Sequence, residues 1–296
     1  MIPRPEVIGL LEHIKQQPDD CSLRLILADW LEDHAEHDAD RARAEILRFQ
    51  VRGGPDPGVR RLQSTFASHW LGPLSPWCQF VSCKGGLLSL RINGPSLSSS
   101  TFQQLADSEA WAWVDELEIR PPLPPRLRVV PLLRRLSSLL LPQMPSGSPI
   151  AELAESGWLQ SLRRLDVSGW QVSQVDAESL FSSSNLSNLR ELIFSRSVLS
   201  SRILRTLGPL RLRRLVLSRA TLGDAEIGQL VQEPNLSTVE ELDLTDNAIL
   251  DAGAFALADS PYLTRVQVLT LFGNLFGVEA RLRLRERFGA RVLFVG

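Results

Sequence analysis

Apolar residues recur along this chain in a pattern that returns about every 27 residues. The clearest copy is VEELDLTDNAI at 239–249, in which a leucine or a similar residue fills every apolar slot. The same pattern begins at eight positions, with spacings of 22 to 27 residues: Leu87, Val114, Leu136, Leu162, Leu189, Leu212, Val239 and Val266. A recurrence of this length indicates a repeat protein, in which each copy is one supersecondary unit.

Each copy predicts one short strand followed by one helix. In Leu-x-x-Leu-x-Leu the apolar residues alternate, as on a strand with one buried face. Between strands, Asp176, Asp224 and Asp251 each precede an alanine-rich or leucine-rich run, and we interpret them as helix-capping carboxylates. A strand and a helix per copy predict an α/β, right-handed solenoid whose parallel strands line one side. Its core is shared between neighbouring copies.

The run Leu-x-x-Leu-x-Leu-x-x-Asn-x-Leu at 239–249 resembles the leucine-rich repeat. The resemblance implies a horseshoe with a strand-lined concave face, and a protein that binds rather than catalyses. Asparagine fills its usual slot at Asn247 and Asn274 only. Other residues stand in that slot elsewhere: Pro95, Met144, Trp170, Ser197 and Ala220. An unbroken ladder of asparagines is therefore not expected.

The chain divides by pattern into three parts. Residues 1–52 carry helix-spaced apolar residues and predict a small all-α domain of three helices, the third at about 40–52. Residues 53–79 begin with a Gly/Pro-rich run and predict a linker and a connecting helix. Residues 80–296 predict the leucine-rich-repeat domain, with an N-terminal hairpin around Lys84-Gly85-Gly86 and a closing helix and strand at the C-terminus.

A second resemblance lies in the helical part. The stretch SLRLILADWLEDHAEHDADRARAEILRFQ at 22–50 is similar to the repeat-companion domain of planctomycete bacteria. The matching positions are Leu25, Ala28, Asp29, Trp30, Leu31, Glu32, Asp33, Arg43, Glu45, Ile46, Leu47, Arg48 and Gln50. The segment 34–40 is a longer acidic insert than that family has. The resemblance implies a domain that precedes a repeat array and brings no assigned reaction.

Composition narrows the class of protein. The net charge of −2 argues against a general polycation for nucleic acid, and no stretch approaches 18 uninterrupted apolar residues. The first residues lack the apolar core of a signal peptide. Three cysteines without CxxC spacing fit a reducing compartment. We therefore expect a cytoplasmic protein without a membrane partner.

Candidate catalytic residues have plainer interpretations. His34, His37, Asp38 and Asp40 have metal-ligand spacing but form an incomplete set, and a solvated acidic loop explains them equally. Asp29 and Glu32 could form an acid/base pair, or could pair with arginines on the helix surface. The sequence shows no Gly-rich phosphate loop and no GxSxG. We predict no enzyme, no cofactor and no metal.

The strands offer a better candidate surface. Two positions beyond the start of each copy, charges alternate along the expected concave face: Arg164, Glu191, Arg214 and Glu241. They could bind a partner or simply pair with one another. Four positions beyond the start, three apolar residues are expected to be exposed: Leu140, Ile193 and Val216. Trp170 is either an anchor for a partner at the rim or a core residue.

These observations predict a protein–protein interaction scaffold that uses the concave face or rim and binds an unidentified protein. The alternative is a nucleic-acid-binding module, because residues 196–219 contain seven arginines and no acidic residue: Arg196, Arg202, Arg205, Arg211, Arg213, Arg214 and Arg219. Neither the partner nor the oligomeric state follows from the sequence, and the role of the helical domain stays open.

Overall fold

The computed structural model of the protein describes residues 4–52, 57–123, 130–145, 150–171 and 173–294. The chain forms two compact units. The N-terminal unit comprises Met1–Arg120 with Val129–Leu139, and the repeat unit comprises Pro121–Arg128 with Leu140–Gly296. The predicted division at residues 52 and 79 stays a prediction.

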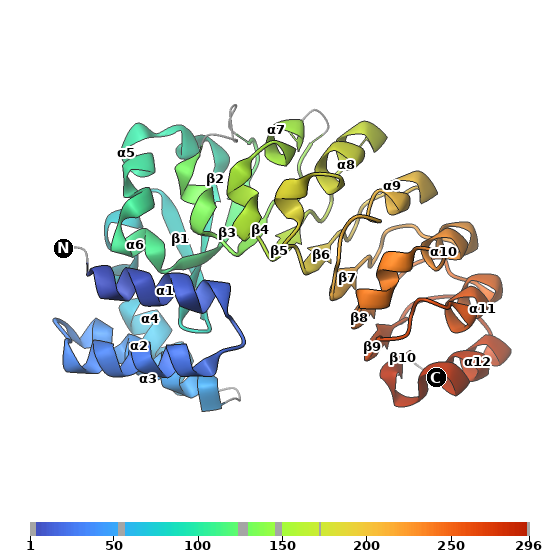
Figure 1. The fold of residues 1–296 in the computed structure, drawn as a ribbon, viewed down its shortest axis with the longest axis horizontal. Helices are drawn as coiled ribbons and strands as arrows, with labels where there is room; N and C mark the ends of the chain where they lie inside the picture. Colours follow the sequence, from blue (N-terminus) through green and yellow to red (C-terminus); the bar gives the residue numbers. More distant parts are fainter. Residues whose placement is uncertain (1–3, 53–56, 124–129, 146–149, 172, 295–296) are drawn as a thin grey trace. The chain divides into compact units, whose positions relative to one another are not determined.

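The N-terminal unit begins with helices and continues into strands (Figure 1). Its helices are α1 (Pro5–Gln16), α2 (Cys21–Asp33), α3 (Asp38–Arg52), α4 (Pro57–Leu71), α5 (Ser100–Gln103) and α6 (Glu109–Ala112). Its strands are β1 (Cys78–Lys84), β2 (Leu87–Asn93) and β3 (Val114–Arg120). The first three helices are those predicted from apolar spacing, although α3 begins two residues earlier than expected.

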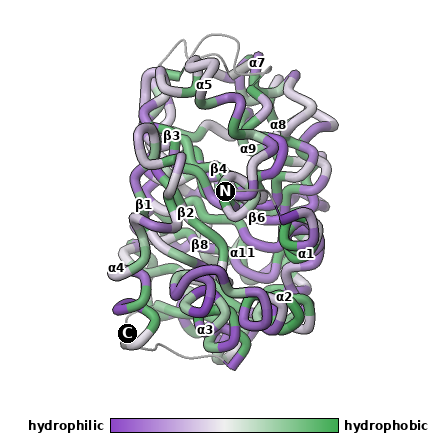
Figure 2. The backbone as a smooth tube through the Cα atoms, turned by 90° about the vertical axis from the view of Figure 1, so that its left-hand side faces the viewer, coloured by the Kyte–Doolittle hydropathy of each residue, from purple (hydrophilic) through white to green (hydrophobic). Residues whose placement is uncertain are grey.

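Apolar faces of α1, α2 and α3 form the core of the helical part. Three residues of α1 at helical spacing are fully buried: Val7, Leu11 and Ile14. Figure 2 shows hydrophobic and hydrophilic segments alternating along α2 and α3, as expected for helices with one buried face. Lys15 joins α1 to the strands, because its Nζ donates hydrogen bonds to the carbonyl oxygens of Val114 at 2.5 Å and Arg135 at 3.1 Å.

The predicted hairpin is confirmed. Strands β1 and β2 pair antiparallel around Lys84, and β2 pairs parallel with β3. Gly85 and Gly86 form the turn with φ of 58° and 83°, a left-handed conformation that glycine adopts freely. A Cβ on Gly86 would lie 2.1 Å from Leu47 Cδ2. Helix α3 therefore packs directly against the turn of the hairpin.

Replacing Gly86 by alanine is expected to destabilise the N-terminal unit by roughly 2 to 4 kcal/mol. The substitution adds a left-handed backbone cost of about 1 to 2 kcal/mol and an overpacking cost of about 1 to 3 kcal/mol against Leu47. Denaturant titration measures the change. The matched control is Gly9→Ala in α1, where nothing lies within 4 Å of the new Cβ. That variant should gain about 0.5 to 1 kcal/mol, and equal effects of both substitutions would contradict this account.

The cysteines are free, and two of them are buried in β1. Burial raises the pKa of Cys78 and of Cys83 to about 12. Thiolates are the reactive form, so these two thiols should be inert near pH 8. We expect a thiol reagent to modify one cysteine per chain rapidly in the native protein, the exposed Cys21, and three in denaturant. Fast modification of all three in the native state would show that β1 opens readily.

The repeat unit alternates strands and helices. Its helices are α7 (Ile150–Ala154), α8 (Gln174–Phe181), α9 (Ser201–Arg205), α10 (Asp224–Leu230), α11 (Asp251–Asp259) and α12 (Val278–Phe288). Its strands are β5 (Arg164–Asp166), β6 (Glu191–Ile193), β7 (Arg214–Val216), β8 (Glu241–Asp243), β9 (Val268–Thr270) and β10 (Val292–Leu293), and β4 (Ser138–Leu140) lies at the division between the units.

Strands β5 to β10 are parallel and follow one another in chain order. Figure 1 shows helices α8 to α12 along the side of the repeat unit away from these strands. The central leucine of each full strand is at most 1% exposed: Leu165, Leu192, Leu215, Leu242 and Leu269. The predicted α/β leucine-rich-repeat solenoid, preceded by an all-α N-terminal part, is confirmed, and so are its closing helix and strand.

The aspartates predicted as helix caps have a different role. The N-cap residues are Ser173 in α8, Gly223 in α10 and Leu250 in α11. Asp224 and Asp251 are the first residues of α10 and α11 and bond to the next copy. The Oδ1 atom of Asp224 accepts the N–H of Leu250 at 2.8 Å, and that of Asp251 accepts the N–H of Gly277 at 2.6 Å. These carboxylates therefore join successive helices, which a pattern within one copy could not reveal.

Asn247 joins neighbouring copies through its side-chain amide. Its Oδ1 accepts the N–H groups of Ala220 at 2.9 Å and Leu222 at 3.1 Å, and its Nδ2 donates to the carbonyl oxygen of Leu217 at 2.9 Å. Because buried backbone groups need partners, this one residue satisfies three of them in the preceding copy.

Trp170 fills the same slot and makes one bond of this kind, to the preceding copy. It is 2% exposed, and its Nε1 donates to the carbonyl oxygen of Leu141 at 2.5 Å. Leu141 has the position in its copy that Leu217 has in its own, so the indole N–H replaces the amide of Asn247 as donor. Trp170 is therefore a core residue, and the interpretation as an anchor at the rim is wrong.

Candidate interaction surface

The charges that alternate on the strand face pair with one another. Glu191 Oε2 lies 3.6 Å from Arg164 Nε and 3.7 Å from Arg214 Nη1. Arg214 Nε lies 3.0 Å from Glu241 Oε2. Partly exposed pairs of this kind contribute about 0 to 1 kcal/mol each. Mutual pairing, one of the two interpretations of this row, is confirmed. The use of the row in binding a partner stays a prediction.

The predicted apolar row is only partly exposed. Leu140 and Ile193 are half-buried, whereas Val216 is 7% exposed and belongs to the core. Val216 pairs in register with Ile193 on the neighbouring strand, so the two β-branched side chains lie next to each other and exclude water. The expectation that Val216 is exposed is therefore wrong.

Three residues after the end of each strand from β4 to β9, one residue adopts a left-handed conformation. It is the seventh residue after the start of its copy in six successive copies: Gln143, Gly169, Arg196, Arg219, Asp246 and Gly273. In the first five of these copies its backbone N–H bonds to the next copy, as Arg196 does to the carbonyl oxygen of Ser218 at 3.0 Å. A left-handed residue other than glycine costs about 1 to 2 kcal/mol. The two glycines in this slot were the sequence signal for the turn, and our sequence analysis missed it.

A polar groove of about 500 Å³ lies at these carboxyl ends of β5 to β8. Its lining residues come from four successive copies and are Asp166, Ser168, Ser195, Arg196, Ser218, Arg219, Asp243, Thr245 and Asp246. Most of them are the sixth or seventh residue after the start of a copy, so the repeat itself brings them together. None of the eight predicted surface residues lines this groove.

Local hydrogen bonds order most of the groove. Asp166 Oδ1 accepts the N–H of Ser168 at 2.9 Å and its hydroxyl at 2.6 Å. Arg219 Nε donates to Asp246 Oδ2 at 2.9 Å. The Arg196 side chain is exposed and makes no hydrogen bond or ion pair with any residue that the structure describes. The groove therefore offers a preorganised polar wall with one available guanidinium.

The arginine-rich block at 196–219 does not form one patch. Arg214 pairs with glutamates on the strand face, Arg213 Nε lies 3.9 Å from Glu240 Oε1, and Arg219 pairs in the groove. Arg202 and Arg205 lie on α9 instead. The block is thus distributed over strands, turns and a helix, and part of its charge is neutralised.

A shorter row of arginines lies at the start of the strands. Backbone bonds place Arg163, Arg190 and Arg213 on successive copies, with the N–H of Arg190 bonded to the carbonyl of Arg163 and the N–H of Arg213 to that of Arg190, both at 2.8 Å. Burial, together with neighbouring arginines, lowers the pKa of Arg190 below its ordinary range. This row places three arginines next to one another on successive copies, and Arg213 also pairs with Glu240.

The histidine and aspartate residues at 34–40 have separate contacts. The His34 ring stacks on Trp30 with centroids 4.5 Å apart, and His37 meets the edge of His69 at 5.2 Å. Asp38 Oδ1 accepts from Arg41 at 3.0 Å. In the part of the chain that the structure describes, no three ligating side chains come together around one point.

Asp29 and Glu32 pair with an arginine of the next helix. Arg48 Nη2 lies 2.7 Å from Asp29 Oδ1 and 2.5 Å from Glu32 Oε2. The hydrogen bonds that Arg48 donates, first the one to Glu32 and then the one to Asp29, raise the pKa of Arg48 above its ordinary range. The interpretation as a helix-surface ion pair is confirmed.

No protein-family model matches this sequence, and no curated protein is similar to it. Among solved structures, an internalin of Listeria monocytogenes has a TM-score of 0.41 at 18% identity, over 71% of this chain and 67% of that one. A leucine-rich-repeat protein of Leptospira interrogans has 0.38 at 19%, over 67% and 51%. A protein of Bacteroides fragilis has 0.38 at 11%, over 67% and 70%.

The resemblance of residues 22–50 to the repeat-companion domain stays a prediction, as does the cytoplasmic location. Across the described ranges, no helix is both long enough and apolar enough to cross a bilayer.

Proposed function

We propose that the repeat unit is a protein-interaction module and that the groove at the carboxyl ends of β5 to β8 is its contact site. The observation that carries the proposal is Arg196, a residue with a strained backbone whose exposed side chain has no partner among the described residues. Backbone strain that glycine would relieve points to a side chain with a task. Glycine occupies the equivalent slot at 169 and 273, so the repeat accepts glycine there.

The groove fits a polar protein segment. Asp166 and Asp243 offer acceptors, the serines offer hydroxyls, and Arg196 offers a donor fork for a carboxylate. The described lining carries three aspartates and two arginines, so its charge is mixed rather than strongly positive. A phosphate backbone would be attracted less strongly to this mixed lining than a protein surface that carries both positive and negative charges. The strand-face row from Arg164 to Glu241 is a second surface that a large partner could reach.

A pull-down tests the proposal with two charge reversals in one copy. Arg196→Glu changes the groove, and Arg202→Glu makes the same change on α9, away from the groove. Wild type and Arg202→Glu should retain the same protein from lysate, with and without nuclease, and Arg196→Glu should retain it about tenfold less, the equivalent of 1.4 kcal/mol.

Equal retention by all three chains would show that the groove is not the contact site. Recovery that disappears with nuclease would favour the nucleic-acid alternative, and the row at Arg163, Arg190 and Arg213 would then be its site. Circular dichroism of each variant checks that the fold is intact.

A further inference from the structure

Arg43 is a buried arginine whose donors are not used by the chain. It lies on α3 and is 6% exposed. Its Cζ is 4.0 Å from the ring centroid of Trp113 and 5.4 Å from that of Trp70, so the indoles attract the guanidinium through their faces. Stacking of this kind leaves the N–H groups at the edge of the guanidinium unsatisfied. No described residue accepts a hydrogen bond from them.

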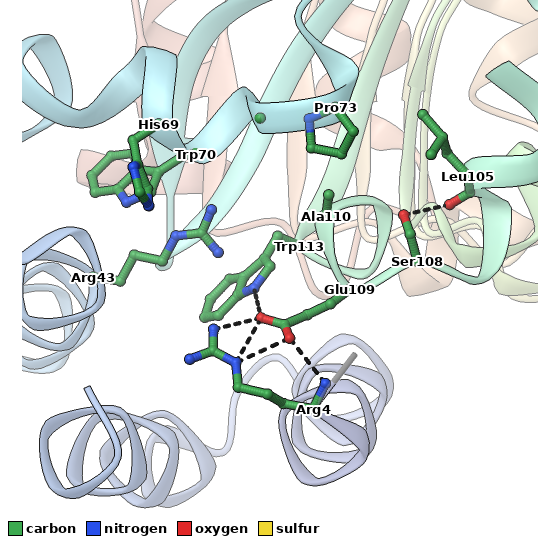
Figure 3. A pocket seen from close by; sticks show the side chains of 11 residues that line it. Arg4, Arg43, His69, Trp70, Pro73, Leu105, Ser108, Glu109, Ala110 and Trp113 are labelled. Atoms are coloured by element: carbon green, nitrogen blue, oxygen red, sulfur yellow. Dashed lines mark hydrogen bonds and ion pairs between the residues drawn. The ribbon is translucent and has the colours of Figure 1, made fainter. Parts of the chain in front are cut away.

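The nearby carboxylates are already engaged by another arginine. Arg4 Nη2 donates to Glu109 Oε1 at 2.6 Å and to Asp40 Oδ1 at 3.2 Å, and Trp113 Nε1 donates to Glu109 Oε1 at 3.4 Å. Figure 3 shows these bonds converging on Glu109, while the Arg43 guanidinium lies apart between the two indoles. The two arginines and the two carboxylates balance in charge, but no described residue accepts a hydrogen bond from Arg43. Burial lowers the pKa of Arg43 to about 10, so it keeps its charge at neutral pH.

The Arg43 guanidinium lines a cavity of about 350 Å³ within the N-terminal unit. This volume lies in the range of small-molecule sites. Much of the wall is apolar and comes from Trp70, Pro73, Leu105, Ala110 and Trp113. His69 also lines it. Ser108 and the paired Arg4 and Glu109 line it too. The cavity thus combines a largely apolar wall, a neutralised ion pair and one further buried cation, Arg43, that has no acceptor among the described residues.

We propose that this cavity binds a small planar organic carboxylate, which accepts hydrogen bonds from Arg43 and lies against Trp70 and Trp113. A carboxylate matches the planar fork of a guanidinium with two parallel hydrogen bonds. A flat unsaturated body suits the indole and proline walls. The proposal concerns the N-terminal unit and is independent of the groove in the repeat unit.

Calorimetric titration of the full chain with benzoate at pH 7 tests the site. Wild type should bind one benzoate saturably, and the neutral isostere benzamide should bind at least tenfold more weakly, because it cannot form a charge-assisted pair. Arg43→Met, which keeps the unbranched apolar stem of the side chain but removes the guanidinium, should lower benzoate affinity at least tenfold. Arg41→Met on the same helix is the control and should leave it unchanged, because Arg41 is exposed.

A second variant covers the case in which Arg43→Met does not fold. Ala110→Leu keeps Arg43 and fills the cavity from a half-buried position, so it should also lose benzoate. The proposal is overturned if wild type shows no saturable benzoate binding, if benzamide binds equally, or if the folded Arg43→Met or Ala110→Leu chain retains affinity. Stronger binding of inorganic phosphate than of benzoate would overturn the carboxylate class.

Discussion

Replacing Arg4 by methionine is expected to destabilise the N-terminal unit by about 3 to 5 kcal/mol at neutral pH, the range for removing one partner of a buried ion pair. Arg4 joins Asp40 at the start of α3 to Glu109 of α6, and its side chain is 13% exposed. The hydrogen bonds that Arg4 donates to Glu109 raise the pKa of Arg4 above its ordinary range. Without the cation, two buried carboxylates lie close together with no ion partner at hydrogen-bond distance.

Denaturant unfolding of both chains at neutral pH checks this result. A control is Arg41→Met, which removes an exposed pair with Asp38 and should change stability by at most about 1 kcal/mol. A change of at most about 1 kcal/mol in the Arg4 variant, as small as that expected of the control, would contradict the role given to Arg4.

Trp170→Ala is expected to cost the repeat unit about 3 to 5 kcal/mol, the range for removing a large aromatic core side chain. The loss has two parts, since the indole fills the core and its N–H satisfies the carbonyl of Leu141. The variant Trp170→Phe separates the contribution of packing from that of the hydrogen bond. Phenylalanine keeps most of the packing but leaves that carbonyl without its donor, which costs about 1 to 3 kcal/mol.

Thermal or denaturant unfolding of the two Trp170 variants measures both parts. The alanine variant should be the less stable, with the phenylalanine variant between it and wild type. Near-wild-type stability of Trp170→Phe would show that the indole N–H is not needed, and that the asparagine slot in this copy acts through packing alone.

Much of the fold was predictable because the repeat encodes it locally. Leu242 and its equivalents lie at fixed spacing, and alternation on a strand determines which of them face the core. The hairpin was predictable for the same reason, since Lys84-Gly85-Gly86 separates two apolar runs. What a pattern within one copy cannot show is a bond between copies, such as the one from Asp224 to Leu250.

The sites were less predictable, because they depend on contacts between residues far apart in the chain. Trp170 was correctly located in its slot, yet only the structure shows which carbonyl its N–H reaches. The sequence did not indicate Arg43 as a binding-site residue, because its partners Trp70 and Trp113 are 27 and 70 residues away in the sequence. Arg196 belonged to an arginine-rich run and shares its left-handed backbone with Arg219; only the contacts in the structure separate the two, because Arg219 pairs with Asp246.

The most direct test of the central claim is site-specific photo-crosslinking in lysate. A photoreactive phenylalanine replaces Thr245 in the groove of one variant and Ser179 on the exposed face of α8 in another. If the groove binds a protein, we expect a covalent protein adduct from position 245 and none from position 179. An adduct only from position 179, or an adduct to nucleic acid, would contradict the proposal that the groove at the carboxyl ends of β5 to β8 binds a protein.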